Sequence, residues 1–352
     1  MSGKKRLMTI KDIALQTGLS KGTVDRVLHN RGEVSKQSYE KVMRYIEESG
    51  YTPNVHASLL ASGQSHRIAA LLPRHEPGSF WELFQDGLDK AEENLHGLGL
   101  SILRFGYDQY DIDSFRAACD ELLASAPDGV VTAPLFLNDT AVLARRLQEA
   151  GIPYVYIDSK LEDDGYMAYF GTARYQRGYL CGYLLADDRP VDQAVMVRVR
   201  RDKNRLSDPT VTRRAGFMDF MFEYAPDCRI SNLFIDPNDP DDIRKELEAF
   251  FDAHPDVRHI AMFNSRIHLI VDFIERRGLQ DQCRIIGFDN LAPNVEALKR
   301  GTVTRLIAQR PAEQVVMAIQ TLSDKILFKK DPVHRDHYMP MDILTRYNVD
   351  YY

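Results

Sequence analysis

The strongest constraint on the fold is the alternation of short apolar runs with helical stretches from residue 67 onward. The apolar runs that we expect to form strands are IAALLP, SILRF, GVVTAP, YVYID, AVMVRV, HIAMFN and RIIGFD. Stretches with helical length and spacing lie between them, at 82–97, 113–125, 140–150, 212–223 and 266–278. Nearly continuous apolar strands that alternate with helices are typical of parallel sheets covered on both faces. We therefore predict an α/β body, and its length suits two such sheets.

Bulk properties predict a soluble protein of more than one domain. The chain has 352 residues, which exceeds the usual size of one domain. No apolar run approaches the ~18 residues of a membrane span, and the start MSGKKRLMTIKDIA lacks the apolar core of an export signal. The cysteines form no CxxC pair, which fits a reducing cytoplasm: Cys119, Cys181, Cys228 and Cys283. We expect a cytoplasmic protein without a metal or cofactor.

Charge is distributed unevenly along the chain. Residues 1–66 carry ten lysines and arginines against six acidic residues, a net charge of +4, whereas the remainder carries −10. Phosphate neutralisation needs local positive charge, so a basic head on an acidic body suggests a polyanion as partner of the head.

The head contains the spacing of three short helices. Thr9 is placed to cap a first helix that Gly18 ends, while Ser20 and Ser35 are placed to cap the second and third. The residues expected to face inward are Ile10, Ile13, Ala14 and Thr17, then Val24, Val27 and Leu28, then Tyr39, Val42, Met43 and Ile46. Two short helices joined by a tight glycine turn form a helix-turn-helix, whose second helix enters the DNA major groove. Small three-helix bundles also occur as plain packing units, so this pattern alone leaves both interpretations open.

A resemblance that covers nearly the whole chain favours DNA binding. The stretch TIKDIALQTGLSKGTVDRVLHNRGEVS, followed by SYEKVMRYIEESGYTPN, resembles the DNA-binding head of the LacI/GalR family of bacterial transcription regulators. The segment VHASLLA at 55–61 is similar to the family's hinge helix, which wedges a leucine into the minor groove. The resemblance implies a helix-turn-helix head at 1–50, a hinge helix and linker at 51–66, and an effector-binding and dimerisation domain at 67–352.

The same resemblance implies which residues contact DNA. They are Thr9, Ser20, Lys21, Gly22, Thr23, Arg26, His29, Asn30, Asn54, Ala57 and Leu60. Lys21 and Arg26 are the candidates for reading guanine, whose O6 and N7 atoms accept from such donors. Gly22 offers no side chain where relatives usually read a base, and Asp25 is negative where relatives often carry a small hydroxyl residue.

For the body, the resemblance implies a type 1 periplasmic-binding-protein fold with two Rossmann-like lobes. We expect an N-lobe at about 67–164 and 292–322 and a C-lobe at about 165–291 and 323–352. The chain would then cross between lobes near residues 164, 291 and 323. The C-terminal stretch YMPMDILTRYNVDYY is expected to pack on the second lobe.

Ligands of open α/β sheets sit beyond the carboxyl ends of the strands. The polar residues at those ends here are Arg74, Asp158, Asn264, Asp289 and Gln309. A single polar residue there usually caps the next turn, whereas five together suggest a site. The segment 171–178 lies where relatives often carry an Asp that contacts ligand, and Thr172 or Ala173 occupies that position.

Aromatic and basic residues complete the expected effector site. Phe80 and Trp81 precede the first body helix, where a ring can stack on a sugar; Trp81 can equally be a core anchor. Arg213 matches the family's R-x-x-G-F arginine. Arg198 or Arg200, together with Arg213, could bind the anionic group of a sugar acid or sugar phosphate, although a solvated loop also explains the basic run 198–205.

These features predict a repressor that binds a pseudo-palindromic operator as a homodimer, with tetramers left open, and that responds to a sugar-like effector. The chain is not expected to be an enzyme, since it has no GxSxG, HExxH, P-loop or GxGxxG after a strand. The alternative is a sugar-binding receptor whose head no longer binds DNA.

Overall fold

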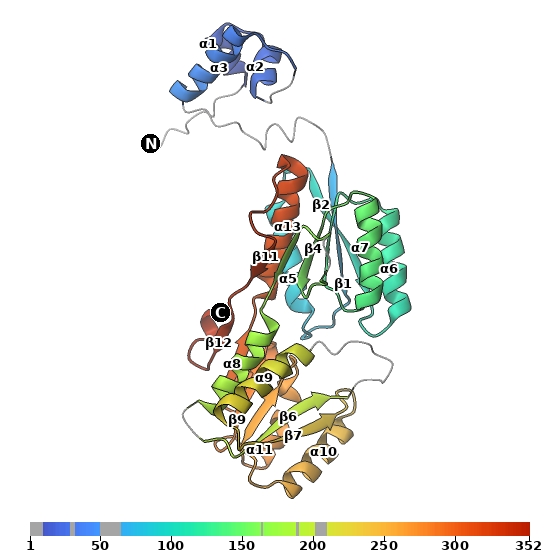
Figure 1. Ribbon diagram of the computed structural model, residues 1–352, viewed down its shortest axis with the longest axis vertical. Coiled ribbons are helices and arrows are strands. Elements are labelled where there is room, and N and C mark those ends of the chain that lie inside the picture. The colour runs from blue at the N-terminus through green and yellow to red at the C-terminus, as the bar shows by residue number, and fades with distance from the viewer. Residues whose placement is uncertain (1–9, 29–31, 50–64, 163–164, 188–189, 201–209) are drawn as a thin grey trace. The chain divides into compact units, whose positions relative to one another are not determined.

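Figure 1 shows a computed structural model of the protein. The structure describes residues 10–28, 32–49, 65–162, 165–187, 190–200 and 210–352. They divide into two compact units, a helical head within the first 65 residues and an α/β body of His66–His96 and Leu100–Tyr352. The predicted hinge helix lies outside the described residues.

The head contains the three predicted helices, α1 (Ile10–Thr17), α2 (Lys21–Leu28) and α3 (Lys36–Ser49). Ser20 and Ser35 cap α2 and α3 as expected, because their Oγ atoms accept hydrogen bonds from the backbone N–H of Thr23 and Ser38. The fully buried core is Ile13, Ala14, Val24, Val27 and Val42. The prediction for Tyr39 was wrong, since it is 46% exposed and Tyr45 packs on the core instead.

The first lobe of the body is a parallel six-stranded sheet in the order β11-β5-β4-β3-β1-β2. Its strands are β1 (His66–Pro73), β2 (Leu100–Tyr107), β3 (Gly129–Thr132), β4 (Tyr154–Asp158), β5 (Ala168–Gly171) and β11 (Asp336–Tyr338). Its helices are α5 (Glu82–Asn94), α6 (Ile112–Ala124), α7 (Leu137–Glu149) and α13 (Pro311–Phe328). In Figure 1, α6 and α7 lie on one side of this sheet and α5 and α13 on the other. The central strands β3, β4 and β5 are buried along their whole length, as two-sided coverage requires.

The second lobe is a six-stranded sheet in the order β12-β10-β9-β8-β6-β7, in which only β12 is antiparallel. Its strands are β6 (Gln193–Val199), β7 (Arg229–Ile235), β8 (His259–Met262), β9 (Arg284–Phe288), β10 (Arg305–Ala308) and β12 (Asp342–Leu344). Its helices are α8 (Arg174–Ala186), α9 (Val211–Tyr224), α10 (Pro240–Ala253), η1 (Ile267–Ile270), α11 (Val271–Arg276) and α12 (Ala292–Arg300). Side chains of α8 and α9 pack in one core of this lobe, and side chains of α10, η1, α11 and α12 pack in another. The short helix η2 (Val349–Tyr351) ends the chain.

The predicted fold class is confirmed, but the predicted crossings between lobes were wrong. Strand β5 still pairs in the first sheet, so the first crossing is at 172–173 rather than 164. Because β10 pairs with β9 in the second sheet, the return crossing follows it at 309–310, not 291. The final crossing lies at 339–341 rather than 323, between β11 of the first sheet and β12 of the second. Alternation of strands and helices does not reveal which sheet a strand joins.

None of the described helices has the length and apolar composition of a membrane span.

Candidate functional site

The outward face of α2 is built as the sequence predicts. Val24 and Val27 are buried, which leaves Lys21, Gly22 and Arg26 exposed. Thr23 is partly exposed, and the Oγ atoms of Thr23 and Ser20 lie 2.8 Å apart at the start of the helix. Lys21 lies in the first turn of α2 and Arg26 in its last turn, so the exposed face of the helix presents two cations, which suit phosphates and base edges. The remaining predicted DNA contacts lie outside the described residues: Thr9, His29, Asn30, Asn54, Ala57 and Leu60.

In the body, two aspartates end strands in the same backbone conformation. Asp158 is the last residue of β4 and has a φ of 57°, and Asp289 directly follows β9 and has a φ of 64°. This left-handed conformation is uncommon for residues other than glycine, and aspartate and asparagine tolerate it best. Backbone hydrogen bonds hold both positions: Asp158 N–H donates to Gln314 Oε1 over 3.0 Å, and Asp289 N–H donates to the carbonyl of Ile307. These hydrogen bonds at the strand ends thus fix the backbone positions from which the two aspartate side chains extend.

Around Asp289 the chain builds a buried hydrogen-bonded cluster. Arg177 of α8 donates from Nη2 to Asp289 Oδ1 over 3.3 Å and from Nη1 to Gln309 Oε1 over 2.8 Å. Gln309 in turn donates from Nε2 to Asp289 Oδ1 over 3.1 Å. Thr172 donates to Gln309 Oε1 over 3.3 Å. Arg177, Asp289, Gln309 and Thr172 are each at most 2% exposed.

This cluster extends into the first lobe. Gln314, the fourth residue of α13, donates from Nε2 to the carbonyl of Gln309 over 2.8 Å while its Oε1 accepts from Asp158. Arg174 lies 3.3 Å from the Asp158 carboxylate. Since Thr172 and Gln309 belong to two of the three crossings, the hydrogen-bonded network runs through the segments that join the lobes. We call these seven residues the crossing cluster: Asp158, Thr172, Arg174, Arg177, Asp289, Gln309 and Gln314.

Arg213 of α9 is held beside the crossing cluster by close packing of two helices. A Cβ added at Gly178 of α8 would lie 1.7 Å from the carbonyl oxygen of Arg213, and one at Gly216 would lie 2.0 Å from that of Tyr175. Only glycine permits this approach, which brings Arg177 and Arg213 close to one aromatic ring. Their guanidinium carbons lie 5.0 and 5.4 Å from the centroid of Phe288.

Burial dominates the electrostatics of this region. It lowers the pKa of Arg213 to about 9, and the positive charge of Arg177 acts in the same direction. Burial also raises the pKa of Asp289, although Arg177 and Arg213 oppose that shift. The charged carboxylate of Asp289 and the charged guanidinium groups of Arg177 and Arg213 therefore stabilise one another, because little water reaches them.

Of the nine predicted effector residues, the structure gathers four: Asp158, Arg213, Asp289 and Gln309. Asn264 lies one residue beyond Phe263, whose carbonyl accepts from Arg213 Nη1 over 2.7 Å, and its own Oδ1 accepts from Arg266 N–H. Arg74 is exposed and donates to Ser114 Oγ over 3.0 Å. None of these contacts joins Arg74 to the crossing cluster.

The aromatic pair lies in the first lobe among other rings. Phe80 and Trp81 pack on each other and on Phe84 with centroid distances of 4.9 to 5.2 Å. Trp81 is 5% exposed and donates from Nε1 to Gln109 at 3.4 Å. Its environment fits the core-anchor interpretation, which was one of the two considered.

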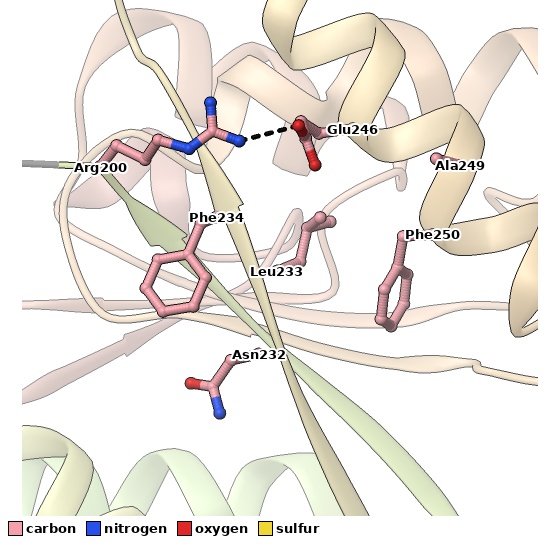
Figure 2. A pocket seen from close by; sticks show the side chains of 7 residues that line it. All are labelled: Arg200, Asn232, Leu233, Phe234, Glu246, Ala249 and Phe250. Atoms are coloured by element: carbon pink, nitrogen blue, oxygen red, sulfur yellow. Dashed lines mark ion pairs between the residues drawn. The ribbon is translucent and has the colours of Figure 1, made fainter.

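The described residues of the basic run predicted to bind an anion, Arg198 and Arg200, contact β7 and α10. Arg198 lies 4.7 Å from the ring centroid of Phe234 on β7, and Arg200 pairs with Asp242 and Glu246 of α10. Figure 2 shows the Arg200–Glu246 pair at a surface recess of about 490 Å³ between β7 and α10. These contacts direct Arg198 and Arg200 toward β7 and α10, and their grouping with Arg213 around an anionic ligand stays a prediction.

Sequence reasoning missed Arg174, Arg177 and Gln314. A signal for Arg177 was present, because it lies on the same helical stripe as Cys181 and Leu185, both fully buried. An arginine on such an apolar stripe needs a buried partner. The position of Gln314 had no comparable signal, since it depends on α13 packing against the first lobe.

Comparisons with known proteins agree with this architecture. A family model for the periplasmic binding protein domain matches residues 68–330, and the model for bacterial regulatory proteins of the lacI family matches 9–54. The solved structure of a “putative LacI transcriptional regulator” from Bacteroides fragilis is 36% identical with a TM-score of 0.75, covering 82% of this chain and 100% of that chain. The ribose operon repressor of Halalkalibacterium halodurans is 23% identical over 97% of this chain and 96% of its own. The HTH-type transcriptional regulator CelR of Thermobifida fusca is 30% identical, but its match spans only 44% of either chain.

Proposed function

Because this chain belongs to the LacI family of bacterial regulatory proteins, we propose that it represses transcription by binding operator DNA under control of a small effector. The predicted family, the two-lobed fold and the non-enzymatic function are confirmed by the comparisons. Its DNA partner, its effector and its assembly as a homodimer, in the cytoplasm where operators lie, are parts of the proposal.

The observation that carries the proposal is the continuity of the crossing cluster. Hydrogen bonds lead from Asp158 through Gln314 and Gln309 to Asp289 and Arg177, from the first lobe to the second. An effector that changes these contacts changes the relation of the lobes. An effector can shift the equilibrium between two arrangements of the lobes only if it binds one arrangement more tightly than the other. Because the contacts of the crossing cluster depend on how the lobes are arranged, an effector that touches them would bind the two arrangements differently.

In the head, α2 supplies the DNA-reading surface. Lys21 and Arg26 contact bases or phosphates, and Ser20 and Thr23 place the helix end against the backbone. Two heads of a two-fold dimer select a pseudo-palindromic operator. The absent side chain of Gly22 removes one base contact, so we expect the consensus to be degenerate at the base it would face.

The test is selection of DNA duplexes from a random pool by the full-length protein. We expect enrichment of a pseudo-palindromic sequence, whose affinity falls by about 1–3 kcal/mol in Arg26→Ala. Lys41→Ala, which removes an exposed cation from α3, serves as the matched control and changes affinity less. Failure to enrich any sequence would support the alternative, a sugar receptor without DNA binding.

A further inference from the structure

The helix α9 carries apolar side chains on two opposite sides. Its inner side packs in the core of the second lobe through Phe217, Phe220 and Met221. Its outer side carries a second apolar row, which we call the α9 stripe: Val211, Ala215, Met218 and Phe222. Successive members of the stripe are four, three and four residues apart, so they lie along one line on the helix surface. A helix that is apolar on both sides is normally covered on both sides.

The α9 stripe is exposed to solvent. Phe222 is 82% exposed and Val211 is 52% exposed, and Met218 and Ala215 are exposed as well. Among the described residues, no member of the stripe takes part in either core of this lobe. Exposed apolar residues normally occur singly on a protein surface, whereas a contiguous row of them marks an interaction surface. The stripe therefore has the position and the composition of a contact surface.

The charges of α9 are ordered along its axis. Its arginines, Arg213 and Arg214, lie in the first turn, whereas Asp219 and Glu223 lie in the second half. This order is unfavourable within one helix, because the N-terminal end of a helix has a partial positive charge and the C-terminal end a partial negative charge. Both carboxylates are exposed and accept hydrogen bonds from tyrosine hydroxyls of α8, and no cation of the described residues pairs with either of them. A neighbouring helix that runs in the opposite direction would compensate these charges.

From the stripe and the order of the charges, we propose that α9 packs antiparallel against α9 of a second copy of this chain. A two-fold axis at the middle of the stripe sets Val211 opposite the partner's Phe222 and Ala215 opposite the partner's Met218. Each facing pair then combines a smaller side chain with a larger one, which favours close packing. Antiparallel packing also places the positive half of each helix beside the negative half of its partner, whereas parallel packing would bring like charges together.

The spacing of the stripe favours a second copy over other covers. Intervals of four, three and four residues read the same in both directions, and a two-fold contact needs such a surface because one patch faces itself. The other candidate covers are residues 201–209, which directly precede α9 and lie outside the described residues, and a different protein. Neither of them requires a symmetric stripe. The inference goes beyond the proposed function, which needs two copies on one operator but assigns no surface that joins copies.

The test measures the mass of the full-length protein in solution by sedimentation over a range of concentrations. Val211→Asp and Phe222→Asp each place two charges in every two-fold contact, so each should raise the dissociation constant of that contact about 100-fold or more. At concentrations where the parent is assembled, the variants should have half its mass. Val142→Asp is the matched control, because it makes the same change at a valine of α7 that is 49% exposed, and it should keep the mass of the parent.

An unchanged mass in both α9 variants would overturn the inference. A lower melting temperature of Phe222→Asp at an unchanged mass would point to residues 201–209 as the cover and would overturn it as well. Because both substituted side chains are exposed, the variants should fold, and their thermal unfolding checks this.

Cysteine cross-linking tests the antiparallel direction. Val211→Cys and Phe222→Cys chains are co-expressed with tags of different length and then oxidised, and a disulfide should join the two differently tagged chains. Either variant alone should not cross-link, because two equal positions would lie about 16 Å apart along the helix axis at 1.5 Å per residue. The parent measures the background from its native cysteines, of which Cys228 is half-buried. No cross-link in the mixture, or a cross-link in Val211→Cys alone, would contradict the antiparallel contact.

DNA selection by the parent separates this contact from the proposed function, because the predicted DNA-reading residues lie in the head. Operator binding together with unchanged masses of the α9 variants would overturn the contact and leave the regulator intact. Halved masses of the variants together with a parent that binds no operator would support the contact and contradict the proposed function.

Discussion

Arg177 donates from Nη2 to Asp289 Oδ1 over 3.3 Å, and the two side chains are only 1% and 3% exposed. Removing one member of such a buried pair leaves the other charge without a partner, which typically costs 3–5 kcal/mol. The pair also joins α8 to the end of β9, so it fixes the wall on which the effector site is built.

Arg177→Met should therefore lower the free energy of unfolding by about 3–5 kcal/mol, since Asp289 is left buried and unpaired. The double variant Arg177→Met/Asp289→Leu should recover much of that loss. Urea unfolding of both variants measures the effect, with Arg244→Met as the exposed control expected within ~0.5 kcal/mol of the parent. A single variant as stable as the parent would show that the pair is not buried in solution.

The close approach of α8 and α9 predicts a steric effect. Gly216→Ala places a methyl group about where the Tyr175 carbonyl oxygen lies, because its Cβ would be 2.0 Å from that atom. The helices must separate, which should cost about 1–3 kcal/mol of unfolding free energy and weaken ligand binding by displacing Arg213. Thermal unfolding and ligand titration of the variant measure both consequences, and an unchanged melting temperature would count against the packing.

A glycine-to-alanine substitution in the head, Gly22→Ala, should stabilise its helix, whereas Gly216→Ala destabilises the body. A Cβ at Gly22, the second residue of α2, would meet only Ser20 Oγ at 3.9 Å, and alanine forms helices better than glycine, by less in this first turn than the ~1 kcal/mol of a helix interior. Gly22→Ala should therefore slow hydrogen exchange of the α2 amides in the full-length protein. Hydrogen exchange that is unchanged or faster would mean that Gly22 does not limit the stability of α2.

The pH dependence of stability should include a contribution from His268. Its Nδ1 lies 2.8 Å from Asn294 Oδ1, and Asn294 Nδ2 donates to three carbonyls, so Oδ1 is the acceptor and the ring donates as a neutral imidazole. Burial lowers the pKa of His268 below its ordinary value of 6.5. The unfolded chain then binds a proton at a higher pH than the folded chain, and stability falls as the pH drops through about 6.5 toward the folded pKa.

His268→Gln removes this contribution. Between pH 7.5 and 5.5, the parent should lose more unfolding free energy than the variant, whereas the exposed His96→Gln should follow the parent. Identical pH profiles for all three proteins would contradict a partly buried His268 that is neutral in the folded protein. The comparison cancels the titration of carboxylates that the three proteins share.

Local patterns in the sequence predicted the local structure well. The stripe of Val24 and Val27, the caps at Ser20 and Ser35, and the apolar strands through β9 all follow from spacing and residue type. Sheet membership was not predictable in this way. It depends on pairings between distant residues, such as Arg305 with Ile286 and Asp336 with Tyr169, which no local period encodes.

In the candidate site too, residues placed by local patterns were predictable, whereas those placed by contacts between distant segments were not. Asp158, Asp289 and Gln309 were predictable because each ends or directly follows a strand, where ligands of α/β sheets bind. The packing of Arg198 on Phe234 of the neighbouring strand was not predictable, because it depends on the pairing of β6 with β7. Gln314 joins the cluster only through the docking of α13, a tertiary contact that the sequence does not reveal.

The most direct test of the account measures operator affinity of the full-length protein with and without the sugar or sugar derivative that binds it most tightly. The proposed coupling predicts a change of about 5–150-fold in the DNA dissociation constant, with an equal reciprocal change in effector affinity when DNA is bound. The change should disappear in Arg213→Gln at the same ligand concentration. An operator affinity that is the same with and without bound ligand would contradict the claim that the crossing cluster controls DNA binding.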